Sequence, residues 1–71
     1  MRTSLGNVLI VKLSSIGDVI HALPVAYAIK ETYPDTKITW VVEPAAYELL
    51  TNNPTIDKII LFEKISNRII T

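Results

Sequence analysis

The stretch NVLIVKLSSIGD, residues 7–18, gives the strongest indication of the fold of this 71-residue sequence. It begins with a continuous run of branched apolar residues, VLIV at 8–11. Such runs are typical of parallel strands that helices cover on both faces. We therefore predict a strand over Asn7–Leu13, buried on both faces, followed by a turn over Ser14–Asp18.

Apolar residues recur at helical spacing after this turn and predict a helix over Asp18–Thr32. Pro24 disturbs the helix because it removes the hydrogen bond to the carbonyl of Ile20. Pro24 could instead begin a second helix, at the first position that proline favours. A kink within one helix is the interpretation we prefer. Tyr33 ends the helix because it precedes a proline.

The remaining chain continues the alternation of strands and helices. KITWVV at 37–42 predicts a second strand, AAYELLT at 45–51 a short helix, and DKIILF at 57–62 a third strand. No element is predicted for residues 63–71. The order strand, helix, strand, helix, strand predicts parallel strands arranged 3-2-1. This is an α/β architecture, the N-terminal part of a doubly wound, Rossmann-like domain.

Length and composition limit how the chain is organised. Seventy-one residues form one domain at most, yet 49% of them are hydrophobic. A chain of this size buries only about 60% of its unfolded surface. The border of the sheet beside the first strand would also be bare, which invites pairing with another chain. We therefore expect a single partial domain over residues 1–71 that self-associates.

The charged residues and the cysteine count exclude several classes of function. Seven basic residues balance seven acidic ones without forming a basic tract, so nucleic-acid binding is not expected. The absence of cysteine excludes disulfides and thiolate metal sites. Apolar runs stay far below the ~20 residues of a membrane-spanning helix. Lys12 inside the first run argues against a signal peptide. These features predict a soluble, cytoplasmic protein.

The turn SSIGD at 14–18 is the expected ligand site, because open α/β sheets bind ligands at the carboxyl ends of their strands. Free N–H groups at the start of the helix favour an anion. Gly17 permits a tight turn and a close approach of the ligand. The hydroxyls of Ser14 and Ser15 can cap the helix or hold a ligand oxygen. A nicotinamide site is not expected, because its fingerprint needs three glycines here and the chain has two in all.

These residues also resemble the start of the bacterial lipopolysaccharide heptosyltransferases, glycosyltransferase family nine. The resemblance rests on the pattern K-x-S-S-x-G-D-x-x-H-x-L-P at 12–24, on WVVE at 40–43 and on the Asn-Pro pair at 53–54. It covers roughly residues 7–62. It implies an inverting transferase of GT-B type, in which this chain is the start of the N-terminal acceptor-binding domain and the C-terminal donor domain is absent.

The resemblance also implies substrates and a location. The donor would be ADP-heptose and the acceptor a lipid A-linked inner-core sugar, with no cofactor and no metal. The protein would be cytoplasmic and could contact the inner membrane peripherally. The fragment by itself would be inactive. The alternative, from a different class of function, is a non-catalytic module that binds a nucleotide or a partner.

Asp18 is the expected catalytic residue. An inverting transfer needs a group that accepts the proton of the acceptor hydroxyl, and a carboxylate within hydrogen-bond distance can do this. The resemblance assigns that role to the aspartate of the motif. The structural alternative is an N-cap, a position that aspartate also favours.

Other polar residues near the turn are the expected substrate contacts, and each has a structural alternative. Lys12 could neutralise a phosphate or carboxylate, or only extend its stem along apolar neighbours. His21 shares a helix face with Asp18 and could orient it, or pack at the surface. Glu43 could meet an acceptor hydroxyl or be a solvated strand end. The expected substrate-binding set is Lys12, Ser14, Ser15, Gly17, His21 and Glu43. Trp40, Tyr27 and Tyr47 are expected to pack in the core or at its rim.

Overall fold

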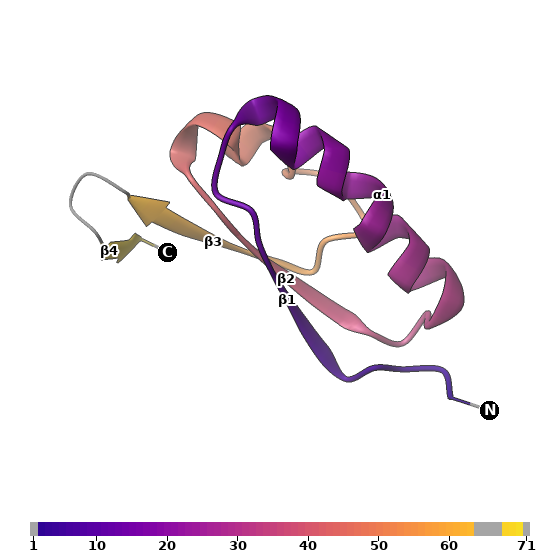
Figure 1. Ribbon diagram of the computed structural model, residues 1–71. Helices are drawn as coiled ribbons and strands as arrows, with labels where there is room; N and C mark the ends of the chain where they lie inside the picture. Colours follow the sequence, from indigo (N-terminus) through magenta and orange to yellow (C-terminus); the bar gives the residue numbers. More distant parts are fainter. Residues whose placement is uncertain (1, 64–67, 71) are drawn as a thin grey trace.

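The computed structural model describes residues 2–63 and 68–70, which form one sheet and the helices that pack on it (Figure 1). The sheet has the order β1-β2-β3-β4. β1, β2 and β3 are parallel, and β4 is antiparallel to β3. The predicted α/β class and the 3-2-1 order of the parallel strands are therefore confirmed. The elements are β1 (Asn7–Val11), α1 (Ile16–Thr32), β2 (Lys37–Val42), η1 (Pro44–Leu49), β3 (Lys58–Glu63) and β4 (Arg68–Ile70).

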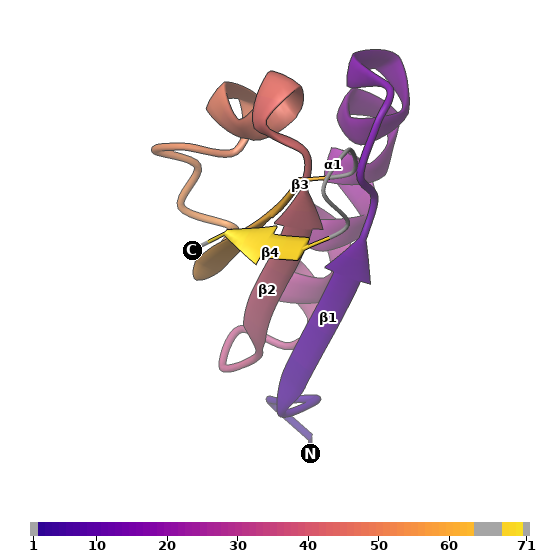
Figure 2. The same cartoon turned by 90° about the vertical axis from the view of Figure 1, so that its left-hand side faces the viewer.

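The core lies between β2 and α1, on one face of the sheet. Ile38, Trp40 and Val42 alternate along β2 and are fully buried, as the side chains of one strand face should be. Val19 and Ala26 of α1 are also fully buried and complete this core. Figure 2 shows the sheet from its other side, with α1 behind it.

The opposite face of the sheet is open among the described residues. Leu9 and Val11 of β1 are 59% and 58% exposed, and exposed and half-buried residues alternate along this strand. The prediction that this strand is buried on both faces is therefore wrong. The physical reason is that α1 covers only one face, so the apolar run VLIV contributes every second side chain to the core.

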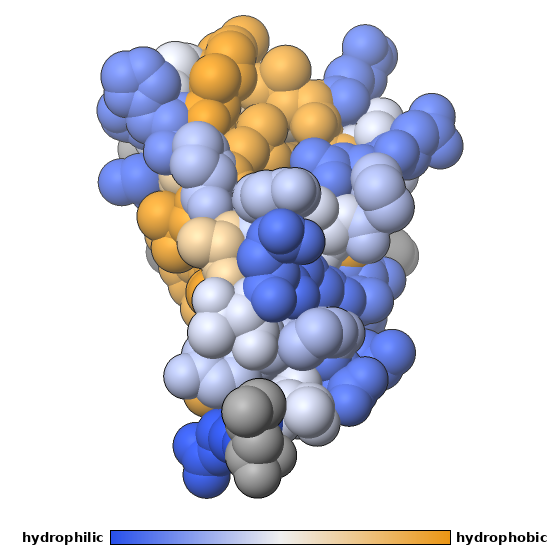
Figure 3. All heavy atoms as spheres, turned by 90° about the vertical axis from the view of Figure 1, so that its right-hand side faces the viewer, coloured by the Kyte–Doolittle hydropathy of each residue, from blue (hydrophilic) through white to orange (hydrophobic). Residues whose placement is uncertain are grey.

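Helix α1 begins at Ile16 and Ser15 is its N-cap, so the predicted start at Asp18 is wrong. Asp18 lies in the first turn of the helix rather than at the cap, which excludes the capping role considered for it. The helix continues through Pro24 to Thr32, which also excludes a separate helix beginning at this proline. Four large apolar residues of α1 are exposed (Ile16, Ile20, Val25 and Tyr27). In Figure 3 apolar side chains gather at the upper middle of the face shown and continue along its left-hand margin, and polar side chains cover most of the remainder.

The connection between β2 and β3 contains a short 3-10 helix in place of a regular α-helix. A 3-10 helix over Pro44–Leu49 replaces the helix predicted for 45–51. Pro44 occupies its first position, where the missing N–H costs nothing. Ala46 and Leu50 are buried and attach this segment to the core. The asparagines and Pro54 that follow favour turns, so the tight helix is not continued.

The third strand and the end of the chain also differ from the prediction. β3 begins at Lys58, one residue later than expected, and the carboxylate of Asp57 just before it accepts the backbone N–H of Ile38. Residues 68–70, for which no element was predicted, form the antiparallel strand β4. At the other end of the sheet the buried hydroxyl of Thr36 accepts the N–H of Leu5 at 2.9 Å and attaches the N-terminal segment.

Candidate active site

The residues predicted to bind substrate lie where β1 ends and α1 begins. Lys12, Ser14 and Ser15 follow β1 directly, Gly17 and Asp18 open α1, and His21 comes one turn later. All six are exposed. They lie at the carboxyl edge of the parallel strands, as predicted. Glu43 follows β2 at the same edge and is half-buried.

Backbone hydrogen bonds connect Glu43 to the segment after β1. The N–H of Lys12 donates to the carbonyl of Val41 at 3.3 Å. The N–H of Glu43 donates to the carbonyl of Leu13 at 3.0 Å. The structure thus brings the ends of β1 and β2 together, and Glu43 adjoins the candidate site through its backbone.

The pairing between β1 and β2 slips by one residue at this point. Val11 pairs with Val41, so a regular parallel ladder would pair the carbonyl of Lys12 with the N–H of Glu43. That N–H donates to Leu13 instead. The carbonyl of Lys12 accepts the indole N–H of the fully buried Trp40, at 3.2 Å. The slip explains why β1 ends at Val11 and not at Leu13.

Asp18 has a free, exposed carboxylate in the first turn of α1. The first helical bond, from Val19 N–H to the carbonyl of Ser15, measures 2.9 Å. No hydrogen bond or ion pair to the Asp18 side chain occurs within residues 2–63 and 68–70. A carboxylate that the fold does not use is available to accept a proton from a ligand. The N-cap residue Ser15 likewise makes no side-chain capping bond.

Gly17 is helical, so the predicted role in a tight turn is not observed. A Cβ atom added at this position would meet only the Oγ of Ser15, at 4.0 Å. The fold therefore has no need of a glycine here on steric grounds. The close approach of a ligand at Gly17 stays a prediction.

The other predicted contacts share this edge without contacting one another. His21 follows Asp18 by three residues, so the two side chains lie on the same side of α1. In the part of the chain that the structure describes, no hydrogen bond or ion pair joins the side chains of Lys12, Asp18, His21 and Glu43. The fold therefore leaves these side chains without polar contacts to one another.

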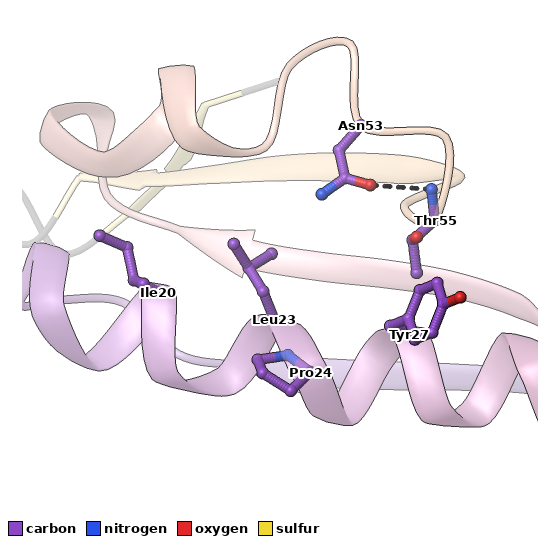
Figure 4. Close-up of a pocket in the computed structure, with 6 residues that line it drawn as sticks. All are labelled: Ile20, Leu23, Pro24, Tyr27, Asn53 and Thr55. Atoms are coloured by element: carbon purple, nitrogen blue, oxygen red, sulfur yellow. Dashed lines mark hydrogen bonds between the residues drawn. The ribbon is translucent and has the colours of Figure 1, made fainter.

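An open groove of about 460 Å³ lies elsewhere on α1 (Figure 4). Its polar rim is the loop before β3, where the side-chain oxygen of Asn53 accepts the N–H of Thr55 at 2.9 Å. It includes none of the predicted site residues, and the sequence contained no signal for it. Its lining consists of Ile20, Leu23, Pro24, Tyr27, Asn53 and Thr55.

Neither a metal cluster nor a spanning helix is found in the described residues. Within residues 2–63 and 68–70, no three carboxylate or imidazole side chains gather as metal ligands would. None of the helices in the same residues combines the length and the apolarity needed to cross a bilayer. The expectation that the reaction uses no metal and no cofactor stays a prediction.

Comparison with known proteins points to one group of enzymes. No protein-family model matches the chain. It is 47% identical over 47 residues to the lipopolysaccharide core heptosyltransferase OpsX of Haemophilus influenzae, a match that covers 66% of the chain. Over 54 residues, 76% of the chain, it is 38% identical to lipopolysaccharide heptosyltransferase 1 of Escherichia coli and 40% identical to that of Pseudomonas aeruginosa. The resemblance to the heptosyltransferases is confirmed.

A solved structure supports the same assignment. The crystal structure of the glycosyl transferase family 9 protein from Veillonella parvula superimposes with a TM-score of 0.81 and 25% identity, over 94% of this chain and 21% of that one. The matches span only 14 to 17% of the length of the heptosyltransferases. The similarity therefore concerns one α/β segment of a longer enzyme.

Proposed function

We propose that this chain is the start of the acceptor-binding N-terminal domain of a lipopolysaccharide core heptosyltransferase. The complete enzyme would have the doubly wound, GT-B architecture, and a C-terminal domain would bind most of the donor. It would transfer heptose from ADP-heptose to a lipid A-linked inner-core acceptor, with inversion. Such a protein would act in the cytoplasm, at the surface of the inner membrane where its acceptor is anchored. The 71 residues alone would be inactive.

Asp18 is the general base in this proposal. The observation that carries it is the exposed carboxylate at the carboxyl edge of the sheet, free of any partner among the described residues. The carboxylate would accept the proton of the acceptor hydroxyl as its oxygen attacks the anomeric carbon of the heptose, and ADP would leave with the electron pair of the broken bond. Lys12, His21 and Glu43 would hold the acceptor from either side, and Gly17 would leave room for it.

The experiment is the Asp18→Asn variant of the complete protein that carries this segment. Loss of a general base costs about 10²- to 10⁴-fold in rate, so we expect transfer from ADP-heptose to fall within that range while the fold is retained. Asp35→Asn is the matched control, because Asp35 is also exposed but lies in the turn before β2, at the other edge of the sheet. Near-normal turnover by a folded Asp18→Asn protein would refute the role. If the wild-type protein binds ADP-heptose but does not transfer the heptose, the alternative of a non-catalytic binding module would be favoured.

A further inference from the structure

Trp40 occupies a special position relative to the candidate site. Its side chain faces α1 from the middle of β2 and is fully buried. Buried indole N–H groups need a hydrogen-bond partner. The partner here is not in the core but beyond the end of β1, at the carbonyl of Lys12.

That carbonyl is the group which the slipped pairing leaves without a backbone partner. In a regular ladder the N–H of Glu43 would donate to the carbonyl of Lys12, but it donates to the carbonyl of Leu13 instead. The indole N–H therefore takes the place of a backbone donor at the point where the chain leaves the sheet. From Lys12 only Leu13 and Ser14 separate this anchor from Ser15, the N-cap of α1.

We infer that Trp40 is a positioning residue for Asp18, acting through the Lys12 carbonyl. The inference rests on the proposed function, because it assigns Trp40 to the site in which Asp18 is the base. The hydrogen bond from the indole holds the carbonyl of Lys12 in place at the start of the segment Lys12–Ser15. The position of this segment sets the position of the first turn of α1, and therefore that of Asp18 relative to the sheet edge. Without the indole N–H, the backbone N–H of Glu43 can donate to the carbonyl of Lys12 in place of that of Leu13. The start of α1 would then move along the edge of the sheet. A displacement of about 1 Å at a catalytic group can cost on the order of 100-fold in rate.

The test compares Trp40→Phe with Ile38→Ala in the complete protein. Ile38 is equally buried on the same strand and face, and its side chain carries no donor toward the segment after β1. We expect both variants to lower the melting temperature. Only Trp40→Phe should lower kcat, by about tenfold or more, with little change in the KM for ADP-heptose, because the displaced group acts in the chemical step. A folded Trp40→Phe protein with wild-type kcat would overturn the inference.

Hydrogen exchange gives a readout that does not depend on activity. The hydrogen-bonded amides at this place are those of Lys12, Val19 and Glu43. They should exchange faster in Trp40→Phe than in Ile38→Ala, and equal exchange in the two variants would also overturn the positioning role. If the wild-type protein shows no transfer, the proposed function is wrong. The exchange data would still show whether Trp40 holds the segment Lys12–Ser15 in place.

An isosteric analogue covers the case in which Trp40→Phe does not fold. Benzothienylalanine placed at position 40 keeps the size of the indole but has sulfur in place of the N–H. It should reproduce both the loss of kcat and the faster exchange. Wild-type values for both quantities in this protein would refute the inference.

Discussion

The ammonium group of Lys30 lies 2.8 Å from a carboxylate oxygen of Asp57, and this ion pair joins the last turn of α1 to the residue before β3. The same oxygen accepts the backbone N–H of Ile38 at 2.7 Å. One carboxylate thus connects the helix, the start of β2 and the start of β3, at the edge of the sheet opposite the candidate site.

The contacts of Asp57 predict a loss of stability in acid. The hydrogen bond from Lys30, followed by that from Ile38, lowers the pKa of Asp57 below its ordinary value of 3.8. A carboxyl whose pKa is lowered by folding stabilises the fold above its unfolded pKa, and this contribution is lost as the pH falls through the folded pKa. We therefore expect the free energy of unfolding to be steady near neutral pH and to decrease below about pH 4.

Asp57→Asn should remove the negative charge and keep one hydrogen bond, because the amide oxygen can still accept the N–H of Ile38. We expect it to cost about 0.5–1 kcal/mol at pH 7, a small value because the pair is partly exposed, and to flatten the acid dependence. Urea unfolding followed by the fluorescence of Trp40, the single tryptophan, measures both quantities. Asp35→Asn is the control that should change neither; an unaltered acid dependence in Asp57→Asn would contradict the assignment.

Gly17→Ala should weaken the binding of the acceptor without lowering the stability of the fold. Alanine is more favourable than glycine in a helix by up to about 1 kcal/mol, and the added Cβ meets only Ser15 at 4.0 Å, so the melting temperature should stay or rise. The methyl group would occupy the space that we assign to the acceptor, so the KM for the acceptor should increase in the complete protein.

Gly6→Ala is the matched control with the opposite signature. Gly6 has a φ of +83°, which strains any side chain, so this variant should lose about 1 kcal/mol of stability and leave the KM unchanged. If Gly17→Ala is as active as the wild type, no ligand approaches the helix at that point.

The open face of the sheet predicts self-association of the 71-residue chain. Leu9, Val11 and Ile69 are 59%, 58% and 62% exposed, and Leu9 and Val11 lie on the face that α1 does not cover. Burying such side chains is worth about 1.5–3 kcal/mol each. Leu9→Lys should therefore shift the chain toward the monomer in sedimentation velocity experiments.

Val25→Lys is the control for this experiment, because Val25 is 57% exposed on α1, away from the open face. It should leave the association unchanged. A wild-type chain that sediments as a compact monomer at all concentrations would show that the open face has no partner in a second copy.

The sequence predicted the parallel strands, and the position of the candidate residues at the end of the first strand, because both depend on local pattern. VLIV and KITWVV are rich in β-branched residues, which favour strands, and SSIGD follows the first strand closely. The boundaries were predicted less well, because a local pattern does not settle at which residue an element starts. Helix α1 begins earlier than expected, with the carbonyl of Ser15 accepting the first helical bond, and β3 begins one residue later than expected.

The contribution of Trp40 to the site could not be predicted from spacing. Trp40 was predicted to pack in the core or at its rim, and its complete burial confirms core packing. The direction in which its N–H points depends on the slip between β1 and β2, which no local pattern encodes. Tyr27 and Tyr47, predicted to pack in the core or at its rim, are 59% and 37% exposed, so neither belongs to the core.

The antiparallel strand β4 limits how this sheet can be enlarged. It occupies the outer border of β3, so a further strand cannot pair with β3 directly, whereas the outer border of β1 is unpaired among the described residues. In a sheet enlarged beside β1, Asp18 would no longer stand at a margin. It would lie at the centre, in the crevice where two crossovers diverge, which is the position that open α/β sheets reserve for their ligands.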